Sequence, residues 1–441
     1  MDYKAALAYL DEVQTRGIKL GLENMHRLLA DMGDPQQAFA SVVVAGTNGK
    51  GSVCAFVDSI LRCAGCTTGM YTSPHLVRYE ERIAVNGALV SPLEFAAAIT
   101  DVRERIEALL AAHSLGSHPT HFEVLTAVAF RHFRERAIRY GVLEVGMGGR
   151  LDAVATARTQ VAVLTNVTLE HTRFLGDTVE AIAREKAGII REGCWVVTSE
   201  TKPEALAVIR AEAAGRGVHI VERHSEAVVT HSPSAAAGRF VLSTRRAAYG
   251  ELVLPLAGRH QVENATLAVL AAEALAEADG LALTPAFVSE GLARTQWPGR
   301  LQIVGENPFF LLDGAHNPAA CESLARALRD LRDTGTFRDL TLVFGALQDK
   351  DVGSMLSHIV PLAQRVVLTR GRSERFLEPG EVAAAVRDLG VVPVIEEDLA
   401  AAVERARADS QAGDAVCLCG SLYLVGDAMS LMGIEPYRPA A

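Results

Sequence analysis

A glycine-rich segment near the N-terminus combines the residue types that bind the phosphates of a nucleotide. Residues 41–53 read SVVVAGTNGKGSV. The valines suit an inner strand of a parallel sheet, the glycines let the backbone approach an anion, and the following helix would present free N–H groups. Lys50 would reach the outer phosphates, and Ser52 would face a magnesium ion. The alternative is an ordinary glycine-rich turn that ends in a solvated lysine.

The spacing of this loop departs from the common phosphate-binding pattern GxxxxGK[ST] at two positions. Val44 stands where the first glycine is expected, and Gly51 separates Lys50 from Ser52. The loop therefore predicts nucleotide binding without matching a generic ATPase.

A carboxylate follows a second apolar run. Residues 142–145 predict a buried strand, and Glu144 opens the stretch EVGMGGRLD, which ends at Asp152. Glu144 should emerge at the carboxyl end of the sheet, beside the phosphate loop. Because Mg²⁺ prefers oxygen ligands and retains waters, one carboxylate with neutral groups and nucleotide oxygens would suffice. Asp152 could either bind substrate or cap the next element.

Two basic residues follow further along the chain. His171 comes after a predicted strand over 161–165 and therefore faces the same sheet edge. Lys186 lies in a predicted helix over 178–187. A lysine brought towards a metal site would be an unfavourable cation unless its amine were modified. Structural roles, a packed histidine and a helix-surface lysine, remain the alternatives.

The second half of the chain repeats the pattern of a strand that leads into a polar turn. Asp313 and His316 lie in the turn DGAHNP, after a predicted strand over 309–312. Residues 344–351, FGALQDKD, place a similar turn after a neighbouring strand. Two such turns in one sheet predict a functional face.

Composition excludes several classes of protein. The formal net charge of −10 argues against a nucleic-acid partner. No stretch of the 441 residues has the apolar length of a membrane span, and the N-terminal residues do not resemble a secretion signal. Seven scattered cysteines, an odd number, favour a reducing compartment. The lone pair Cys63 and Cys66 indicates structural thiols more than a zinc or redox site. We therefore expect a cytoplasmic protein with no membrane partner.

The order of patterns predicts an α/β protein with two domains. Between residues 41 and 190, apolar runs alternate with helical patterns, which is typical of a mostly parallel sheet of the phosphate-loop type. Short β-biased runs over about 218–257 predict a small antiparallel sheet appended to this domain. The alternation restarts after Pro298 and Gly299, so we expect a boundary between 1–297 and 298–441. The second domain would be a smaller Rossmann-like α/β unit.

At this point the chain resembles a known family, the folylpolyglutamate synthases and dihydrofolate synthases, within the Mur-ligase-like ATP-dependent amide ligases. The resemblance covers nearly the whole chain. It is carried by residues 17–25, 46–52, 72–76 with Glu81 and Arg82, Phe122 with Glu123 and Thr126, 144–153, His171, 185–189, His260 with Gln261 and Asn264, 298–300, 313–318, 349–351 and 420–424. The family's loop is GTNGKGS, so Val44 and Gly51 are expected in it.

The resemblance implies a set of functional residues. The implied ATP-binding residues are Asn48, Gly49, Lys50, Gly51, Ser52, Asn264, Arg300 and Asp313. The implied metal ligands are Ser73, Glu144, His171 and Lys186 as a carbamate, and the implied catalytic residues are Lys50, Lys186 and His316. The implied folate or pteroate contacts are Ile18, Lys19, Leu20, Phe122, Asp152, Ala153 and Val154. The chain departs from the family pattern at Glu170, where aspartate is usual, and at 154–155, where Thr-Asn is usual.

The resemblance also implies the reaction. A pteroate or folate carboxylate would attack the γ-phosphate of ATP, and the amine of L-glutamate would displace phosphate from the resulting acyl phosphate. Two Mg²⁺ ions would assist a monomeric enzyme. The acceptor could be dihydropteroate, a reduced folate, or both. A peptidoglycan-precursor Mur ligase and a phosphate-loop ATPase without ligase activity are the alternatives.

Overall fold

A parallel sheet forms the centre of the first lobe of the molecule. The computed structural model describes residues 1–17, 19, 21–231 and 238–437. Within these ranges, eight strands form a sheet of order β4-β3-β2-β5-β1-β6-β7-β8. All neighbouring pairs are parallel except those of β3 and β4. The strands are β1 Ala40–Ala45, β2 Thr68–Tyr71, β3 Ile83–Val85, β4 Ala88–Leu89, β5 Tyr140–Glu144, β6 Thr159–Leu164, β7 Trp195–Thr198 and β8 Ile220–Glu222.

Helices cover both faces of this sheet, so β1 is buried on both sides. Val42 and Val44 pack into one hydrophobic cluster, with α3 and α10, and Val43 packs into the cluster on the opposite face. This placement explains the unbroken apolar run in β1. The helices of the lobe are α1 Tyr3–Gln14, α2 Glu23–Asp31, α3 Lys50–Cys63, α4 Pro92–Ala111, α5 His121–Glu135, α6 Thr172–Leu175, α7 Val179–Ala187, α8 Pro203–Gly215, α9 Arg223–Glu226, α10 Arg259–Asp279 and α11 Pro285–Ala293.

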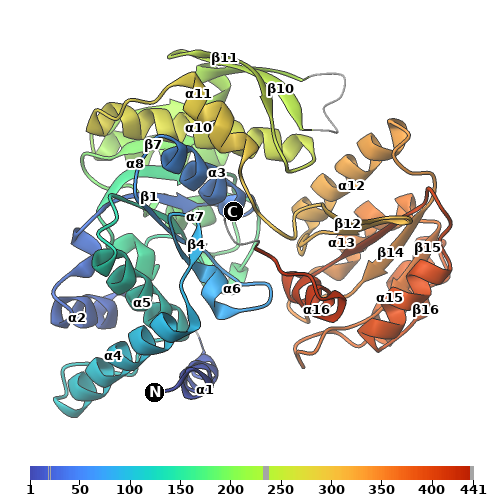
Figure 1. The fold of residues 1–441 in the computed structure, drawn as a ribbon, viewed down its shortest axis with the longest axis horizontal. Helices are drawn as coiled ribbons and strands as arrows, with labels where there is room; N and C mark the ends of the chain where they lie inside the picture. The colour runs from blue at the N-terminus through green and yellow to red at the C-terminus, as the bar shows by residue number, and fades with distance from the viewer. Residues whose placement is uncertain (18, 20, 232–237, 438–441) are drawn as a thin grey trace.

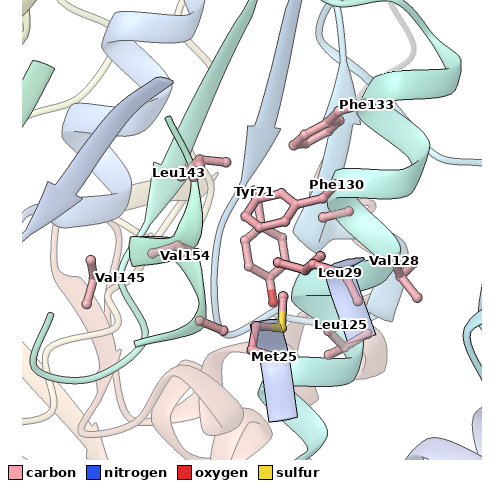
Figure 2. Packing of buried hydrophobic residues seen from close by; sticks show 14 of the residues in the cluster. Met25, Leu29, Tyr71, Leu125, Val128, Phe130, Phe133, Leu143, Val145 and Val154 are labelled. Carbon is pink, nitrogen blue, oxygen red and sulfur yellow. The ribbon is translucent and has the colours of Figure 1, made fainter. Parts of the chain in front are cut away.

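Aromatic and aliphatic side chains fill the space between the sheet and α5. Figure 2 shows Tyr71 from β2 lying against Phe130 of α5, with Met25 of α2 close by. Val154 belongs to the same cluster and is 0% exposed. The side chain of Val154 is used in packing, and its contact with a pterin stays a prediction.

A small antiparallel sheet covers one end of the first lobe, above α10 in Figure 1. Its strands are β9 Ala227–His231, β10 Arg239–Thr244 and β11 Ala248–Val253. The predicted small sheet is confirmed, but its predicted start at 218 is wrong. Residues 220–222 form β8, which pairs in parallel with β7 of the large sheet.

A second α/β lobe follows, drawn in orange and red in Figure 1. In the described residues, its sheet has the order β12-β13-β17-β14-β15-β16, and only β12 is antiparallel. The predicted strand over 309–312 is confirmed as β13, and the predicted polar turn at 344–351 follows a second strand of the same sheet. The elements are β12 Gln302–Glu306, β13 Phe309–Leu312, α12 Pro318–Asp333, β14 Leu340–Phe344, α13 Val352–Ile359, β15 Arg365–Leu368, α14 Pro379–Asp388, β16 Val394–Ile395, α15 Leu399–Ala408, β17 Ala415–Cys419 and α16 Leu422–Met432.

None of the helices in the described ranges combines the length and the apolarity needed to span a membrane.

Candidate active site

The predicted phosphate loop connects the end of β1 to the start of α3. Gly46 and Gly49 have φ angles of 147° and 85°, which favour glycine. Gly51 is required for a different reason, because a Cβ there would lie 3.0 Å from Cε2 of Trp297 and overlap the indole ring. The glycine that separates Lys50 from Ser52 therefore lets a tryptophan from the segment before β12 pack directly on the loop.

Two side chains of this loop have well-defined partners. The Lys50 ammonium donates to the carbonyl oxygens of Gly46 and Thr47, both at 3.1 Å, so it lies over its own loop. Asn48 pairs with Asn317 of the second lobe through their side-chain amides. The loop is thus in direct contact with both lobes.

A cavity of about 400 Å³ opens between the two lobes at this loop. All eight residues predicted to bind ATP line it, as do Ser73, Glu144, His171 and His316 from the other predicted sets. The structure therefore brings together residues that lie more than 250 positions apart. Lys350, Ser421 and Tyr423 add further polar groups from the second lobe.

Glu144 is a buried carboxylate at the end of β5, as predicted. One of its oxygens accepts a hydrogen bond from the Ser73 amide at 3.0 Å. Burial raises the pKa of Glu144, and the nearby positive charge of Lys50 opposes this effect. Among the described residues, Glu144 forms no ion pair within 4.0 Å. A buried carboxylate without a paired cation is suited to receive a metal ion.

Lys186 is buried, so the alternative of a helix-surface lysine is wrong. Its side chain is 1% exposed, and its ammonium donates to the Gly46 carbonyl at 2.8 Å and to Glu170 at 2.7 Å. Burial lowers the pKa of Lys186 to about 8, with Glu170 opposing. Lys186 does not itself line the cavity, whereas its partner Glu170 does. The Lys186 amine therefore lies beside the phosphate loop, with a pKa below the usual lysine range.

His171 follows Glu170 and lines the cavity from the loop after β6. Its backbone has a φ angle of 47°, a left-handed conformation that is uncommon outside glycine. A strained backbone at a cavity wall is typical of functional positions. The predicted position of His171 at the shared sheet edge is confirmed, whereas its role as a ligand stays a prediction.

Asp313 and His316 lie at the end of β13, across the cavity from the phosphate loop. The Asp313 carboxylate accepts from the amides of Leu301 and Ala315, each at 2.8 Å. Burial raises the pKa of Asp313, and the positive charge of Arg300 opposes the increase. His316 is hydrogen-bonded through Nδ1 to the Gly314 carbonyl at 2.8 Å, and burial lowers its pKa to about 4. His316 is therefore neutral near pH 7.

A second cavity, of about 720 Å³, adjoins the first. Of the residues predicted to contact a folate or pteroate, Lys19, Phe122, Asp152 and Ala153 line it. Ile18 and Leu20 lie outside the described residues. Val154 faces the core instead, as described above. The second cavity thus contains most of the described positions in this predicted set.

The predicted capping role of Asp152 is confirmed, whereas substrate binding by Asp152 stays a prediction, although the residue lines the second cavity. Its carboxylate accepts from the amides of Gly146, Met147 and Val154, each at 3.0 Å. These bonds order the glycine-rich turn after β5. Burial raises the pKa of Asp152 to about 6, although the backbone donors oppose this effect.

The two cavities share one wall, which sequence reasoning identified only in part. Ser73, Pro74, Gly146, His171, Arg375 and Tyr423 line both cavities. Ser73 and His171 were predicted site residues, whereas Arg375 was not. Arg375 lies in the polar segment RSERF, which has no motif that would distinguish it from an ordinary loop. Asn317 was also missed, because its partner Asn48 is distant in sequence.

Comparisons with known proteins assign both lobes to one family. Residues 44–272 match the Mur ligase middle domain, and residues 299–422 match the Mur ligase, glutamate ligase domain. These matches cover the phosphate loop in the first lobe and the Asp313 turn in the second.

Relatives align over nearly the full chain. The dihydrofolate synthase/folylpolyglutamate synthase of Bacillus subtilis is 34% identical over 96% of this chain and 98% of its own length. The protein of that name in Escherichia coli is 33% identical over 97% of this chain and 94% of its own. A crystal structure of the folylpolyglutamate synthase of Mycobacterium tuberculosis, complexed with ADP and AMPPCP, has a TM-score of 0.90 at 32% identity. It covers 99% of this chain and 100% of that one.

The relatives share this chain's fold over nearly its full length. The cavity between the lobes contains the residues that a nucleotide-dependent ligase needs. The chain belongs to the Mur ligase family, among the dihydrofolate synthases and folylpolyglutamate synthases, and is an ATP-dependent ligase.

Proposed function

We propose that this enzyme joins L-glutamate to the carboxylate of a pteroate or folate, using ATP and releasing ADP and phosphate. The observation that carries the proposal is the wall shared by the two cavities. A nucleotide over the phosphate loop and a pterin against Phe122 would meet at this wall. The acceptor carboxylate would then lie beside the terminal phosphate.

The first step forms an acyl phosphate. An oxygen of the acceptor carboxylate attacks the γ-phosphorus, and the bond from that phosphorus to the ADP oxygen breaks. Both reactants are anions, so the main task of the protein is to neutralise and position charge. Lys50 from the phosphate loop and Arg300 from the second lobe line the nucleotide cavity and supply positive charge on two sides. Both side chains are half-buried, so their attraction to the phosphates would be screened less than at an open surface.

The surroundings of Glu144 suit magnesium. The buried carboxylate of Glu144, the hydroxyl of Ser73 and the imidazole of His171 line the same cavity. In the described residues, no three His, Cys, Asp or Glu side chains form a metal cluster by themselves. An ion would therefore also need nucleotide oxygens, waters or a carbamate on Lys186. Bound Mg²⁺, as one ion or two, would neutralise the phosphates during transfer.

The second step forms the amide. The nitrogen of glutamate attacks the acyl carbon, and the bond from that carbon to the phosphate oxygen breaks. The attacking ammonium must first lose a proton. His316 can accept a hydrogen bond from this ammonium at Nε2, because its Nδ1 donates to the Gly314 carbonyl. A pKa of about 4 makes the imidazole a weak base, so His316 would position the amine rather than keep its proton.

The direct test uses purified enzyme with ATP, Mg²⁺ and labelled glutamate. Dihydropteroate and tetrahydrofolate are offered separately, and product on either acceptor supports the proposal. Release of ADP should depend on both glutamate and the acceptor. Equal ADP release without them would identify a phosphate-loop ATPase instead, and ligation only to a peptidoglycan precursor would identify a different Mur ligase.

We also propose that the enzyme acts as a monomer in the cytoplasm. All seven cysteines are free thiols, which suits a reducing compartment. The nucleotide cavity is lined by two lobes of a single chain, so no second copy is needed to complete it. Light scattering of the purified protein tests the oligomeric state.

A further inference from the structure

Arg375 differs from the other arginines of its loop. The loop runs between β15 and α14. Arg370 pairs with Glu378 at 2.7 Å, and Arg372 pairs with Asp427 at 2.7 Å. Among the described carboxylates, none lies within 4.0 Å of the Arg375 guanidinium. Asp349, whose charge interacts with Arg375, is paired with Lys350 at 2.9 Å.

The backbone of Arg375 is nevertheless held in place. Its carbonyl accepts from the Gln348 amide at 3.0 Å, and the side-chain amide of Gln348 also reaches the Phe376 carbonyl at 3.3 Å. Phe376 is 2% exposed and anchors the loop in the core of the second lobe. Arg375 thus carries an unpaired cation on a fixed backbone.

Its position is at the junction of the two cavities. Arg375 is the only arginine among the residues that line both the nucleotide cavity and the cavity beside Phe122, within the described chain. Of the three carboxylates on the walls of the second cavity, Asp11 accepts from the Tyr79 hydroxyl at 3.4 Å, and the other two are held by backbone amides. Glu123 accepts from the Thr120 amide at 2.7 Å, and Asp152 is bound by three backbone amides. Arg375, which is exposed on the cavity wall, is therefore free to pair with an anion of the substrate.

The two acceptor classes differ in the anion they would present there. Dihydropteroate has a single carboxylate, which is the one that reacts. A folate ends in a glutamyl residue with two carboxylates: the γ-carboxylate reacts, and the α-carboxylate lies a few bonds away. With the γ-carboxylate at the shared wall, the α-carboxylate must also lie near this junction. Arginine suits it, because its planar guanidinium binds carboxylates through two parallel hydrogen bonds.

We infer that Arg375 binds the α-carboxylate of the terminal glutamyl residue on a folate acceptor, and so serves glutamate addition to folates but not to dihydropteroate. This inference rests on the proposed function. It assigns Arg375 a role in acceptor specificity and leaves the chemical steps to the residues already described.

The test compares acceptors in the wild type and in Arg375→Ala. With tetrahydrofolate, kcat/KM should fall about 10- to 100-fold, mainly through a higher KM for the folate. With dihydropteroate, kcat/KM should change by less than about threefold. Arg375→Lys should recover part of the loss, because it retains the charge without the planar fork. The control is Arg329→Ala, which removes an exposed arginine of α12 that lines neither cavity.

A folate whose terminal α-carboxylate is an amide gives an independent measurement. The wild type should use this analogue about as poorly as Arg375→Ala uses tetrahydrofolate, and Arg375→Ala should use both folates equally. An equal loss with both acceptor classes, or a raised KM for L-glutamate, would overturn the inference. So would a wild type that accepts dihydropteroate but no folate. A wild type that ligates glutamate to no acceptor would instead refute the proposed function.

Discussion

Asn48 of the phosphate loop and Asn317 of the second lobe are joined by a reciprocal pair of amide hydrogen bonds. Asn317 donates to Asn48 Oδ1 at 2.9 Å, and Asn48 donates to Asn317 Oδ1 at 3.3 Å. Asn317 also caps α12, because its Oδ1 accepts from the Ala320 amide at 2.8 Å. The helix cap of one lobe therefore holds the phosphate loop of the other.

Substitutions of Asn317 should distinguish its contact with Asn48 from its role as the cap of α12. Serine still caps a helix but cannot reach back with an amide, so Asn317→Ser should weaken the contact between the lobes by about 1 kcal/mol. Hydrogen exchange at residues 46–49 of the ligand-free enzyme should then be several-fold faster. Asn317→Ala should give the same increase and also destabilise the second lobe by about 1 kcal/mol. Unchanged exchange in Asn317→Ser would show that the amide pair does not hold the loop.

Lys186→Ala should retain ATP binding and lose amide formation. The lysine does not line the cavity, so its removal deletes no side chain that would bind the nucleotide, although Gly46 and Glu170 lose their buried partner. Turnover should fall at least about 100-fold, because the site loses the amine proposed to carry a carbamate. Titration calorimetry with ATP and a ligase assay measure the two effects. Lys4→Ala, at an exposed position on α1, is the control. Near-normal turnover in Lys186→Ala would refute its catalytic role.

Gly426 in α16 packs closely against the backbone of the first lobe. A Cβ at this position would lie 2.6 Å from the carbonyl carbon of Leu76, which follows the Ser73 turn. Gly426→Ala should push the lobes apart and reduce ligase activity at least about 10-fold, since a small misplacement of catalytic groups is costly.

The control for this variant is Gly380→Ala in α14. A Cβ there would meet no atom within 4 Å, so the change should be neutral or stabilise the protein by up to about 1 kcal/mol. Activity assays and thermal unfolding of both variants provide the comparison. Equal activity in the two alanine variants would contradict the importance of the Leu76 contact.

His260 should make stability depend on pH. Burial lowers the pKa of His260 to about 4 in the folded protein, whereas a histidine in the unfolded chain has a pKa of about 6.5. Unfolding below pH 6.5 therefore takes up a proton, and the stability contributed by the neutral imidazole is lost as the pH falls from 6.5 towards 4. Relative to His260→Gln, the wild type should lose on the order of 1 kcal/mol between about pH 7.5 and pH 5. Urea unfolding at both pH values measures this difference. An unchanged difference between wild type and variant would contradict the burial effect.

Much of the fold could be predicted from the sequence because its signals are local. The apolar run over 42–45, the glycines after it and the lysine at 50 lie within one strand-turn-helix unit, which the structure confirms as β1 and α3. The same is true of β5 with Glu144 and of β13 with Asp313. The positions of these residues at sheet edges follow from chain direction, since parallel strands end on the same side.

Tertiary packing decided the features that local patterns cannot specify. The helical pattern around Lys186 left open which face is buried, and the structure buries the lysine against Glu170 and Gly46. Val154 follows the cavity residue Asp152 by only two positions, yet it packs into the core under α5. In both cases the direction of a side chain depends on neighbours that are distant in the sequence.

The sequence by itself determined the nucleotide loop, the polar turns after the strands and the family of the chain, because each is written in a short contiguous motif. Only the tertiary structure showed that Asn48 bonds to Asn317 and that Leu76 packs against Gly426. It alone also placed Arg375 where the two cavities meet. These contacts join residues of different lobes, which are far apart in the sequence. A local periodicity or a short motif cannot predict them, because they depend on how the surfaces of the two lobes fit together.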